Sequence, residues 1–279
     1  MLKQATPISL FPFNYKKKEK PMNALSVVII TFNEEKNIKR CIESVIPVAD
    51  EIIVIDSYSG DKTLEIALSL GAKVKQSTFD GYIKQKNKAI NEASNHYVLL
   101  LDADEFLSEE LASSILHAKK NFIYKAYSMK RCNIFRGKCI RHGLWYPDRK
   151  LRLFDKRFGH CGGLNPHDMI VMQEKTEIKL LEGDMFHHTF ENVEAYRRRN
   201  NEVSTVIAQS LFDAGKKKSR WKIILSPLWS FVNGYFLRLG FLEGYNGFAI
   251  AVLTAQQSFL KYQKLRQLQR QQISEMAWE

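Results

Sequence analysis

The stretch "LSVVIITFNEEKNIKRCIESV", residues 25–45, decides the fold class of the N-terminal half of the chain. It opens on a largely β-branched run, residues 26–31, which is typical of a strand buried on both faces. Asn33 then stands where a helix N-cap belongs, and the helix dipole would favour Glu34 and Glu35 in a first turn. Apolar residues follow at helical spacing, namely Ile38, Cys41, Ile42 and Val45. The stretch therefore predicts a buried strand followed at once by an amphipathic helix.

The same alternation continues through the next 75 or so residues, by the spacing of apolar runs and turn residues. The predicted elements are a strand at 52–55, a helix at 62–70, a short strand at 73–76, a helix at 83–95, a strand at 97–101 and a helix at 109–119. Strands and helices that alternate at this pace predict an α/β fold with a mainly parallel sheet flanked by helices. Further strand-like runs at 126–135, 150–156 and 177–190 indicate that the sheet becomes mixed.

Carboxylates gather where one of these predicted strands ends. Asp102, Asp104 and Glu105 lie within four residues, directly after the apolar run 97–101. Ligands of open parallel sheets bind at the carboxyl ends of the strands. An acidic edge repels phosphate unless a divalent cation lies between them, and Mg²⁺ is typically held by one or two carboxylates together with substrate phosphates. The pattern therefore predicts a metal-bound diphosphate.

Other nucleotide-binding classes lack their motifs in this chain. Neither the GxGxxG fingerprint nor the GxxxxGK[ST] phosphate loop occurs, which disfavours a dinucleotide-dependent dehydrogenase and a P-loop enzyme. A nucleotidyltransferase remains an alternative, although it would be expected to carry a Gly-rich basic loop where this chain has "TFNEEKN". A basic nucleic-acid-binding protein is suggested by the formal charge of +12. It ranks last because an acid-lined edge suits phosphate backbones poorly.

Taken together, the motifs carry a family resemblance. Four stretches resemble, in this order along the chain, the nucleotide-binding half of family 2 glycosyltransferases with the GT-A fold. They are residues 25–45, residues 51–75, "GYIKQKNKAINEA" and "YVLLLDADEFLSEEL". "DRKLRLFDK", "NPHD" and "LLEGDMFHHTF" extend the likeness to about residue 190. Within that family, the chain looks most similar to bacterial lipopolysaccharide core β-glucosyltransferases. The resemblance implies a GT-A domain over residues 23–192.

The resemblance also implies roles for individual residues. Asp104 would be the metal ligand and His187 would complete the metal shell, with Mg²⁺ or Mn²⁺ as the ion. Asp168 would be the general base, with His167 beside it, although the closer relatives usually have Glu there. Glu105 would support local structure. The residues expected to contact the nucleotide sugar are Thr31, Asn33, Glu34, Asp56 (at the uracil edge), Lys86, Asp102 and Arg152.

The implied activity is an inverting, metal-dependent hexosyl transfer. A hexose, expected to be glucose, would pass from a UDP-sugar to a sugar hydroxyl of a lipopolysaccharide core or another cell-envelope glycan. The acceptor hydroxyl would attack C1 through an oxocarbenium-like transition state, with the base on the face opposite the diphosphate.

Residues 193–279 form the predicted helical, amphipathic C-terminal region, in which aromatic and basic residues interleave between Lys216 and Phe241. Two interpretations are open. The region either packs as a helical subdomain or dimer interface, or it lies on a membrane surface with aromatics at headgroup depth. The second would place the protein at the inner face of the cytoplasmic membrane, as a peripheral protein.

Two further features bear on location. We expect residues 1–22 to form a flexible extension and not a signal peptide, because their short apolar stretch precedes the basic run and contains two prolines. The four cysteines, Cys41, Cys132, Cys139 and Cys161, include no CxxC pair, so we expect four free thiols in a reducing cytoplasm.

Overall fold

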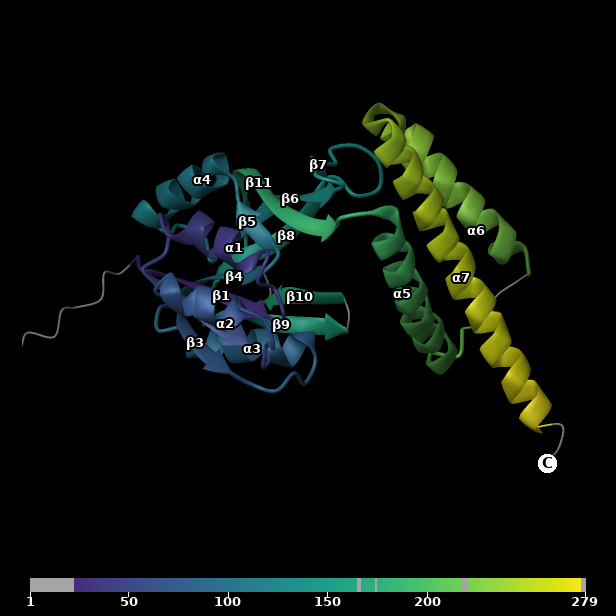
Figure 1. Ribbon diagram of the computed structural model, residues 1–279, viewed down its shortest axis with the longest axis horizontal. Coiled ribbons are helices and arrows are strands. Elements are labelled where there is room, and N and C mark those ends of the chain that lie inside the picture. Colours follow the sequence, from purple (N-terminus) through teal and green to yellow (C-terminus); the bar gives the residue numbers. More distant parts are fainter. Residues whose placement is uncertain (1–22, 165–166, 174, 217–219, 277–279) are drawn as a thin grey trace, which may run out of the picture.

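The computed structural model describes residues 23–164, 167–173, 175–216 and 220–276. Figure 1 shows a sheet flanked by helices and, beside it, a lobe of three long helices. The lobe helices are α5 (Val193–Asp213), α6 (Arg220–Val232) and α7 (Tyr245–Met276). The predicted N-terminal extension, 1–22, and the first two residues of "NPHD" lie outside the described residues.

The described residues form a nine-stranded sheet in the order β3-β2-β1-β4-β8-β6-β11-β5, with β7 paired to β6. Strands β1 to β4 are mutually parallel, whereas β8 runs antiparallel to both of its neighbours. The strands are β1 (Leu25–Thr31), β2 (Glu51–Asp56), β3 (Lys73–Gln76), β4 (Tyr97–Asp102), β5 (Glu105–Leu107), β6 (Ala126–Phe135), β7 (Lys138–Cys139), β8 (Asp148–Asp155) and β11 (Ile178–Phe190). The predicted α/β class, parallel first and mixed later, is confirmed.

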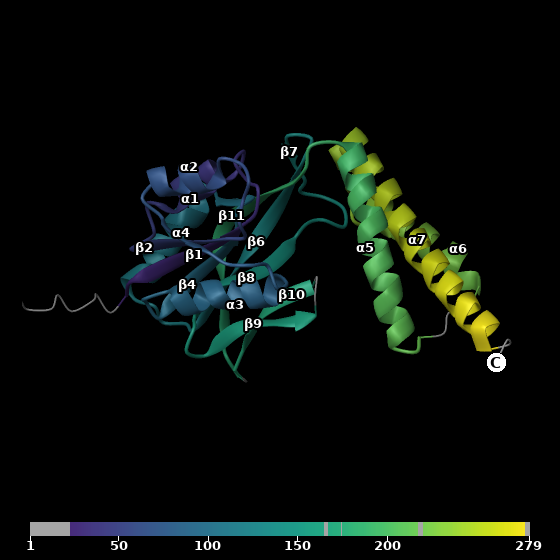
Figure 2. The same cartoon turned by 60° about the horizontal axis from the view of Figure 1, so that its bottom comes forward.

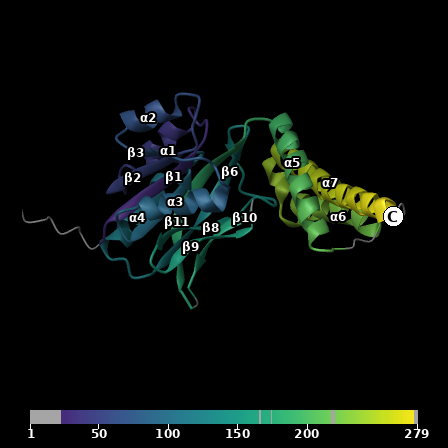
Figure 3. The same cartoon turned by 90° about the horizontal axis from the view of Figure 1, so that it is seen from below.

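Helices cover both faces of the sheet, as Figures 2 and 3 show. On one face, the apolar residues of β1 and β4 pack against α1 (Ile38–Val45), α2 (Thr63–Ser69) and α4 (Glu109–Lys120). On the other face they pack against α3 (Tyr82–Glu92) and a separate hairpin of β9 (Gly159–Leu164) and β10 (His167–Met172). All seven residues of β1 are buried, which is why its centre, residues 27–30, is apolar on both faces of the sheet.

The prediction that Asn33 caps the first helix was wrong. Helix α1 begins only at Ile38, after Asn37, and Asn33 adopts a left-handed backbone with φ of 53°. The side-chain oxygen of Asn33 accepts a hydrogen bond from the backbone amide of Gly60. The backbone amide of Asn33 donates a hydrogen bond to Ser59 Oγ. The chain after β1 is thus bonded to the loop after β2, a long-range contact that local helix signals do not contain.

One pair of cysteines also differs from the expectation. Cys132 and Cys139 form a disulfide, with Cα atoms 5.8 Å apart, whereas Cys41 and Cys161 are free and buried. The expectation of four free thiols was therefore wrong for this pair. Strand β7 folds back on β6 through a tight turn with Gly137 at φ of 75°, and this hairpin brings the two side chains together.

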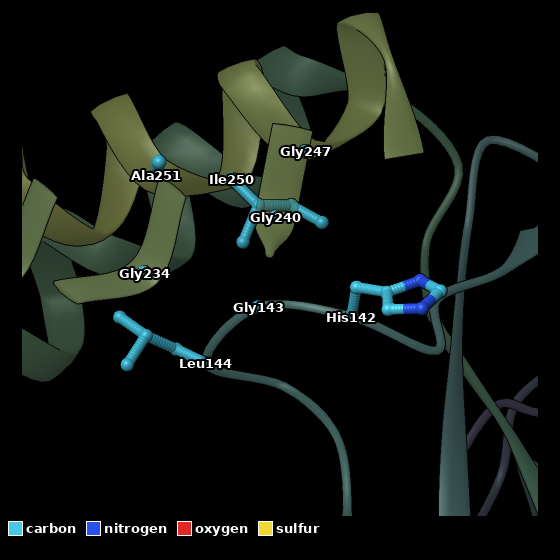
Figure 4. Close-up of a pocket in the computed structure, with 8 residues that line it drawn as sticks. All are labelled: His142, Gly143, Leu144, Gly234, Gly240, Gly247, Ile250 and Ala251. Carbon is cyan, nitrogen blue, oxygen red and sulfur yellow. The ribbon is translucent and has the colours of Figure 1, made fainter. Parts of the chain in front are cut away.

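The helical lobe joins the sheet through an apolar cluster and a close backbone contact. Phe135 at the end of β6 packs with Tyr196 of α5 and Leu253 of α7. Nearby, the loop at residues 141–145 lies against the turn between α6 and α7, where the Gly143 amide donates to the Arg238 carbonyl at 2.8 Å. Figure 4 shows the glycines that line this joint, Gly234, Gly240 and Gly247.

Among the described residues, none of the helices combines the length and apolar character needed to cross a membrane.

The close approach at Gly247 predicts a stability effect. A Cβ atom there would lie 1.8 Å from the Gly240 carbonyl oxygen, which is backbone and cannot swing away. Gly247→Ala should therefore lower the free energy of unfolding by about 2–3 kcal/mol, as overpacking does. Urea denaturation measures the loss. Gly60→Ala is the matched control, because no atom lies within 4 Å of its Cβ position, and equal stability of the two variants would contradict the prediction.

Candidate active site

A cleft of about 1130 Å³ opens at the carboxyl ends of β1 and β4. Eight of the ten predicted site residues line it, namely Thr31, Glu34, Lys86, Asp102, Asp104, Arg152, Asp168 and His187. The remaining two, Asn33 and Asp56, do not. The fold therefore brings together residues that are up to 156 positions apart, from Thr31 to His187. These residues come from strands β1, β4, β8, β10 and β11 and from helix α3.

Glu105 is the centre of a buried ion network beneath the cleft. Its side chain is fully buried and accepts hydrogen bonds from Arg152 at 2.8 Å and Arg131 at 3.1 Å. Its second oxygen accepts from the backbone amide of Asp102 at 3.1 Å. Burial alone would raise the pKa of Glu105, but the two guanidinium groups outweigh it and hold that pKa well below its usual range. This geometry fits the interpretation of Glu105 as a supporting residue.

Arg152 extends this network to the cleft. Its guanidinium also donates to the Asp102 carboxylate at 3.0 Å, so one side chain holds two acids. Burial opposes the charge of Arg152, yet the adjacent Glu105 and Asp102 outweigh burial and raise its pKa further. Arg131 pairs in addition with Asp148 at 2.7 Å. The acids of the "DADE" run therefore repel one another less than their spacing suggests, because buried cations lie between them.

Asp104 and His187 face each other at the cleft wall. His187 Nε2 lies 3.2 Å from one carboxylate oxygen of Asp104, and the other oxygen is buried without a hydrogen-bond partner. On the far side of the ring, Nδ1 lies 2.7 Å from the side-chain oxygen of Asn133, whose amide nitrogen donates to the Trp145 carbonyl. Nδ1 therefore donates to Asn133, and Nε2 is the ring nitrogen turned toward Asp104.

The Asp104 carboxylate and the His187 ring nitrogen can share a proton or bind a metal ion. A carboxylate oxygen and an imidazole nitrogen are both metal ligands, so this pair fits a divalent cation. The described residues contain no group of three or more such ligands, so a cation at this pair would need water or a bound diphosphate to complete its coordination. Thr31 Oγ1, also buried and unpaired, adds another free oxygen to the cleft.

Lys86 joins the Asp102 side of the cleft to the Asp168 side. Its ammonium lies 3.0 Å from Asp102 and 2.8 Å from Asp168, and its side chain is almost completely buried. Burial and Arg152 lower the pKa of Lys86, but Asp102 and Asp168 outweigh them and the net shift is upward. Lys86 therefore remains charged and holds the Asp168 carboxylate, which strand β10 carries into the cleft.

Asp56 lies outside the cleft in this structure. Its carboxylate is fully buried and accepts hydrogen bonds from the amide and hydroxyl of Ser59 and from Gln76. Asn33 is bonded to the same loop. The uracil role of Asp56 and the nucleotide role of Asn33 stay predictions. Glu34, by contrast, lines the cleft, where burial raises the pKa of its carboxyl.

Several residues in and beside the cleft carry no local sequence signal. Asn133 lies inside β6 and Arg131 two positions before it, in a run that reads only as a strand. Arg199 reaches the cleft from α5, outside the predicted GT-A domain. The pairing of β6 with β8 and β11 brings Arg131 to Glu105 and Asn133 to His187.

Comparison with known proteins agrees with this geometry. Residues 26–177 match the model of glycosyl transferase family 2. The chain belongs to this family. The predicted family and the GT-A fold are thus confirmed, and with them a glycosyltransferase activity, in place of the nucleotidyltransferase and nucleic-acid-binding alternatives.

Among its relatives in glycosyl transferase family 2, this chain is 35% identical over 258 residues to an uncharacterized glycosyltransferase of Rickettsia typhi, covering 88% of each chain. It is 28% identical over 263 residues to a lipopolysaccharide core biosynthesis glycosyltransferase of Rhizobium meliloti, covering 87% of this chain and 94% of that one. A solved structure of glucosyl-3-phosphoglycerate synthase from Mycobacterium tuberculosis matches 41% of this chain and 44% of that one, at 24% identity and a TM-score of 0.34. That likeness is too limited to transfer ligands or residue roles.

The buried position of Glu105 predicts both a stability loss and a pH dependence. Glu105→Gln should lower the free energy of unfolding at neutral pH by about 3 kcal/mol, because it leaves the buried Arg152 and the half-buried Arg131 under-compensated. The folded pKa of Glu105 lies below its usual 4.5, so its contribution is complete above that pH and is lost as the pH falls further.

Urea denaturation between pH 3 and pH 7 measures this difference. The gap between wild type and Glu105→Gln should narrow as the pH falls below about 4.5. Glu182→Gln, an exposed position on β11, is the matched control and should leave stability nearly unchanged. A gap that is independent of pH would contradict the assigned charge state of Glu105.

Proposed function

We propose that this glycosyltransferase moves a hexose, glucose in the first instance, from a UDP-sugar to a hydroxyl of a lipopolysaccharide core or related envelope glycan, with inversion. The observation that carries the proposal is the facing carboxylate and imidazole of Asp104 and His187, beside a cleft that also contains the Asp168 carboxylate. A divalent cation, Mg²⁺ or Mn²⁺, would be held by Asp104 and His187. Such an ion would neutralise charge on the diphosphate and so make the nucleoside diphosphate a better leaving group.

The donor half of the cleft suits a nucleoside diphosphate. Phe32, Phe79 and Tyr82 line it with their side chains at least 38% exposed. A flat pyrimidine base can pack against such rings. Asp102, whose backbone and carboxylate are both held by the buried network, is placed to bind the ribose or the diphosphate side of the donor.

Asp168 is proposed as the general base. The acceptor hydroxyl forms the new bond to C1 of the donor sugar while the bond from C1 to the diphosphate oxygen breaks. The hydroxyl proton passes to a carboxylate oxygen of Asp168. Lys86 holds Asp168 in position before the acceptor binds, and it leaves the second carboxylate oxygen available, because the contact uses Oδ2.

The acceptor half of the cleft is cationic. Arg149 and Lys150 of β8 and Arg199 of α5 line the cleft in addition to the half-buried Arg131 and the buried Arg152, although Lys150 and Arg199 also pair with Asp148 and Glu202. An acceptor glycan that carries phosphate or carboxylate groups would match this charge, which is why we propose an envelope glycan and not a neutral sugar. Such acceptors are built on lipid, so we further propose that the enzyme acts as a peripheral protein at the inner face of the cytoplasmic membrane.

The donor and metal assignment predicts a ligand-dependent stabilisation. UDP-glucose with Mn²⁺ should raise the melting temperature of the wild-type protein more than either alone, because both bind only the folded state. Asp104→Asn should remove the Mn²⁺-dependent part of this shift. The measurement is a thermal-shift titration, and Asp213→Asn on the helical lobe is the matched control. A wild-type protein that ignores UDP-sugars with either metal would overturn the proposal.

The base assignment predicts separate effects on binding and on turnover. Asp168→Asn should reduce the transfer rate by about 10²–10⁴-fold, the usual contribution of a general base, while donor binding persists. Asp168→Glu keeps the carboxylate and should retain part of the activity. UDP release in the presence of a lipopolysaccharide core acceptor measures transfer, and calorimetry with UDP measures binding. Normal turnover by Asp168→Asn would remove Asp168 as the base.

A further inference from the structure

Helix α6 presents an apolar stripe to the outside of the molecule. Trp221, Ile224, Leu225, Leu228 and Trp229 recur at the three- and four-residue spacing of one helix face. In a globular protein such a stripe faces the core, yet each of these side chains is between 55% and 71% exposed. The residues that face inward include Ser226, whose hydroxyl contacts that of Ser258 on α7 at 2.9 Å. The apolar face of α6 is thus turned away from its own protein.

The exposed apolar residues continue along the chain beyond α6. The π-helical turn η1 (Asn233–Leu237) and the 3₁₀ turn η2 (Gly240–Glu243) connect α6 to α7. We call the stripe and these turns together the lobe face, which comprises Trp221, Ile224, Leu225, Leu228, Trp229, Phe236, Leu237, Leu239, Phe241 and Leu242. All ten side chains are at least 44% exposed. Figures 1 and 2 show α6 on the side of the lobe away from the sheet, so the catalytic domain does not cover it.

The chain segment that carries the lobe face has charges of one sign. Residues 216–242 contain six Lys and Arg residues and no Asp or Glu. Of these cations, Lys222 and Arg238 are exposed beside the apolar residues. The next acid in the chain, Glu243, is buried and held by Lys138 at 3.0 Å and His142 at 2.7 Å, so it does not offset the surface charge.

This combination selects one occupant among those that could cover an apolar face. A second copy of the chain related by two-fold symmetry would place two positively charged patches against each other, and like charges in an interface are unfavourable. An anionic bilayer surface satisfies both features, because Trp, Phe and Leu side chains enter the headgroup region while Lys and Arg meet lipid phosphates. We propose that the lobe face binds an anionic phospholipid bilayer, with α6 lying in the plane of the interface.

The inference deepens the proposed function and rests on it only for the location of the acceptor. The glycine joint holds the turn between α6 and α7 against the loop at 141–145, which leads into the cleft-lining strand β8. Membrane contact through the lobe face would thus hold the catalytic cleft at a fixed orientation to the bilayer. A soluble donor could enter while a lipid-linked acceptor stays anchored.

Vesicle flotation of the full-length protein tests the inference. The wild type should float with vesicles of phosphatidylcholine and phosphatidylglycerol, and less with phosphatidylcholine alone or in high salt. Trp221→Ser combined with Trp229→Ser should weaken binding about tenfold or more, because both rings leave the interface. Ile123→Ser is the matched control, since Ile123 is 75% exposed on the catalytic domain, and it should float like the wild type.

The contrary outcomes are distinct. The inference is overturned if the wild type stays unbound, if the double tryptophan variant floats as well as the wild type, or if light scattering shows a dimer that this variant dissociates. The donor thermal shift, measured on the same samples, reports the proposed function separately. Vesicle binding without a UDP-sugar response would leave the lobe face a membrane surface and remove the donor assignment.

Discussion

The buried carboxylate of Glu105 is the contact on which the geometry of the cleft depends. It holds two arginines from β6 and β8 and the backbone amide of Asp102, so that three strands meet at one charged group. An ion network of this kind is costly to bury, and the pairing of its opposite charges offsets that cost. The same network sets the position of the acids above it, since Arg152 reaches both Glu105 and Asp102.

Above this base, acids and cations lie together in the cleft. Asp104 and His187 face each other as a carboxylate and an imidazole, which are both metal ligands. Arg149, Lys150 and Arg199 also line the cleft. Lys86 pairs with Asp102 and with Asp168. Such a set of groups suits the proposed transfer, in which an anionic diphosphate leaves and a hydroxyl attacks.

The sequence was most informative where local pattern and burial agree. The strand at 73–76 and the strand at 126–135 were predicted with the bounds that the structure has. The first helix was placed too early, because Asn33 and Glu34 resemble capping residues locally but bond to the loop after β2. The three-residue strand β5 was not predicted, since Glu105–Leu107 is too short to show a period. Its pairing with β11 puts Glu105 opposite His187.

By itself, the sequence determined the α/β class, the family and the acids at the strand ends, because apolar periodicity and ordered motifs are local properties of the chain. The tertiary structure alone decided that Glu105 is buried between two arginines, that Asn133 orients His187, and that Asp56 is closed off by Ser59 and Gln76. It also decided that the apolar stripe of α6 faces outward. These features depend on which strands and helices lie next to each other, and no spacing along the chain encodes that directly.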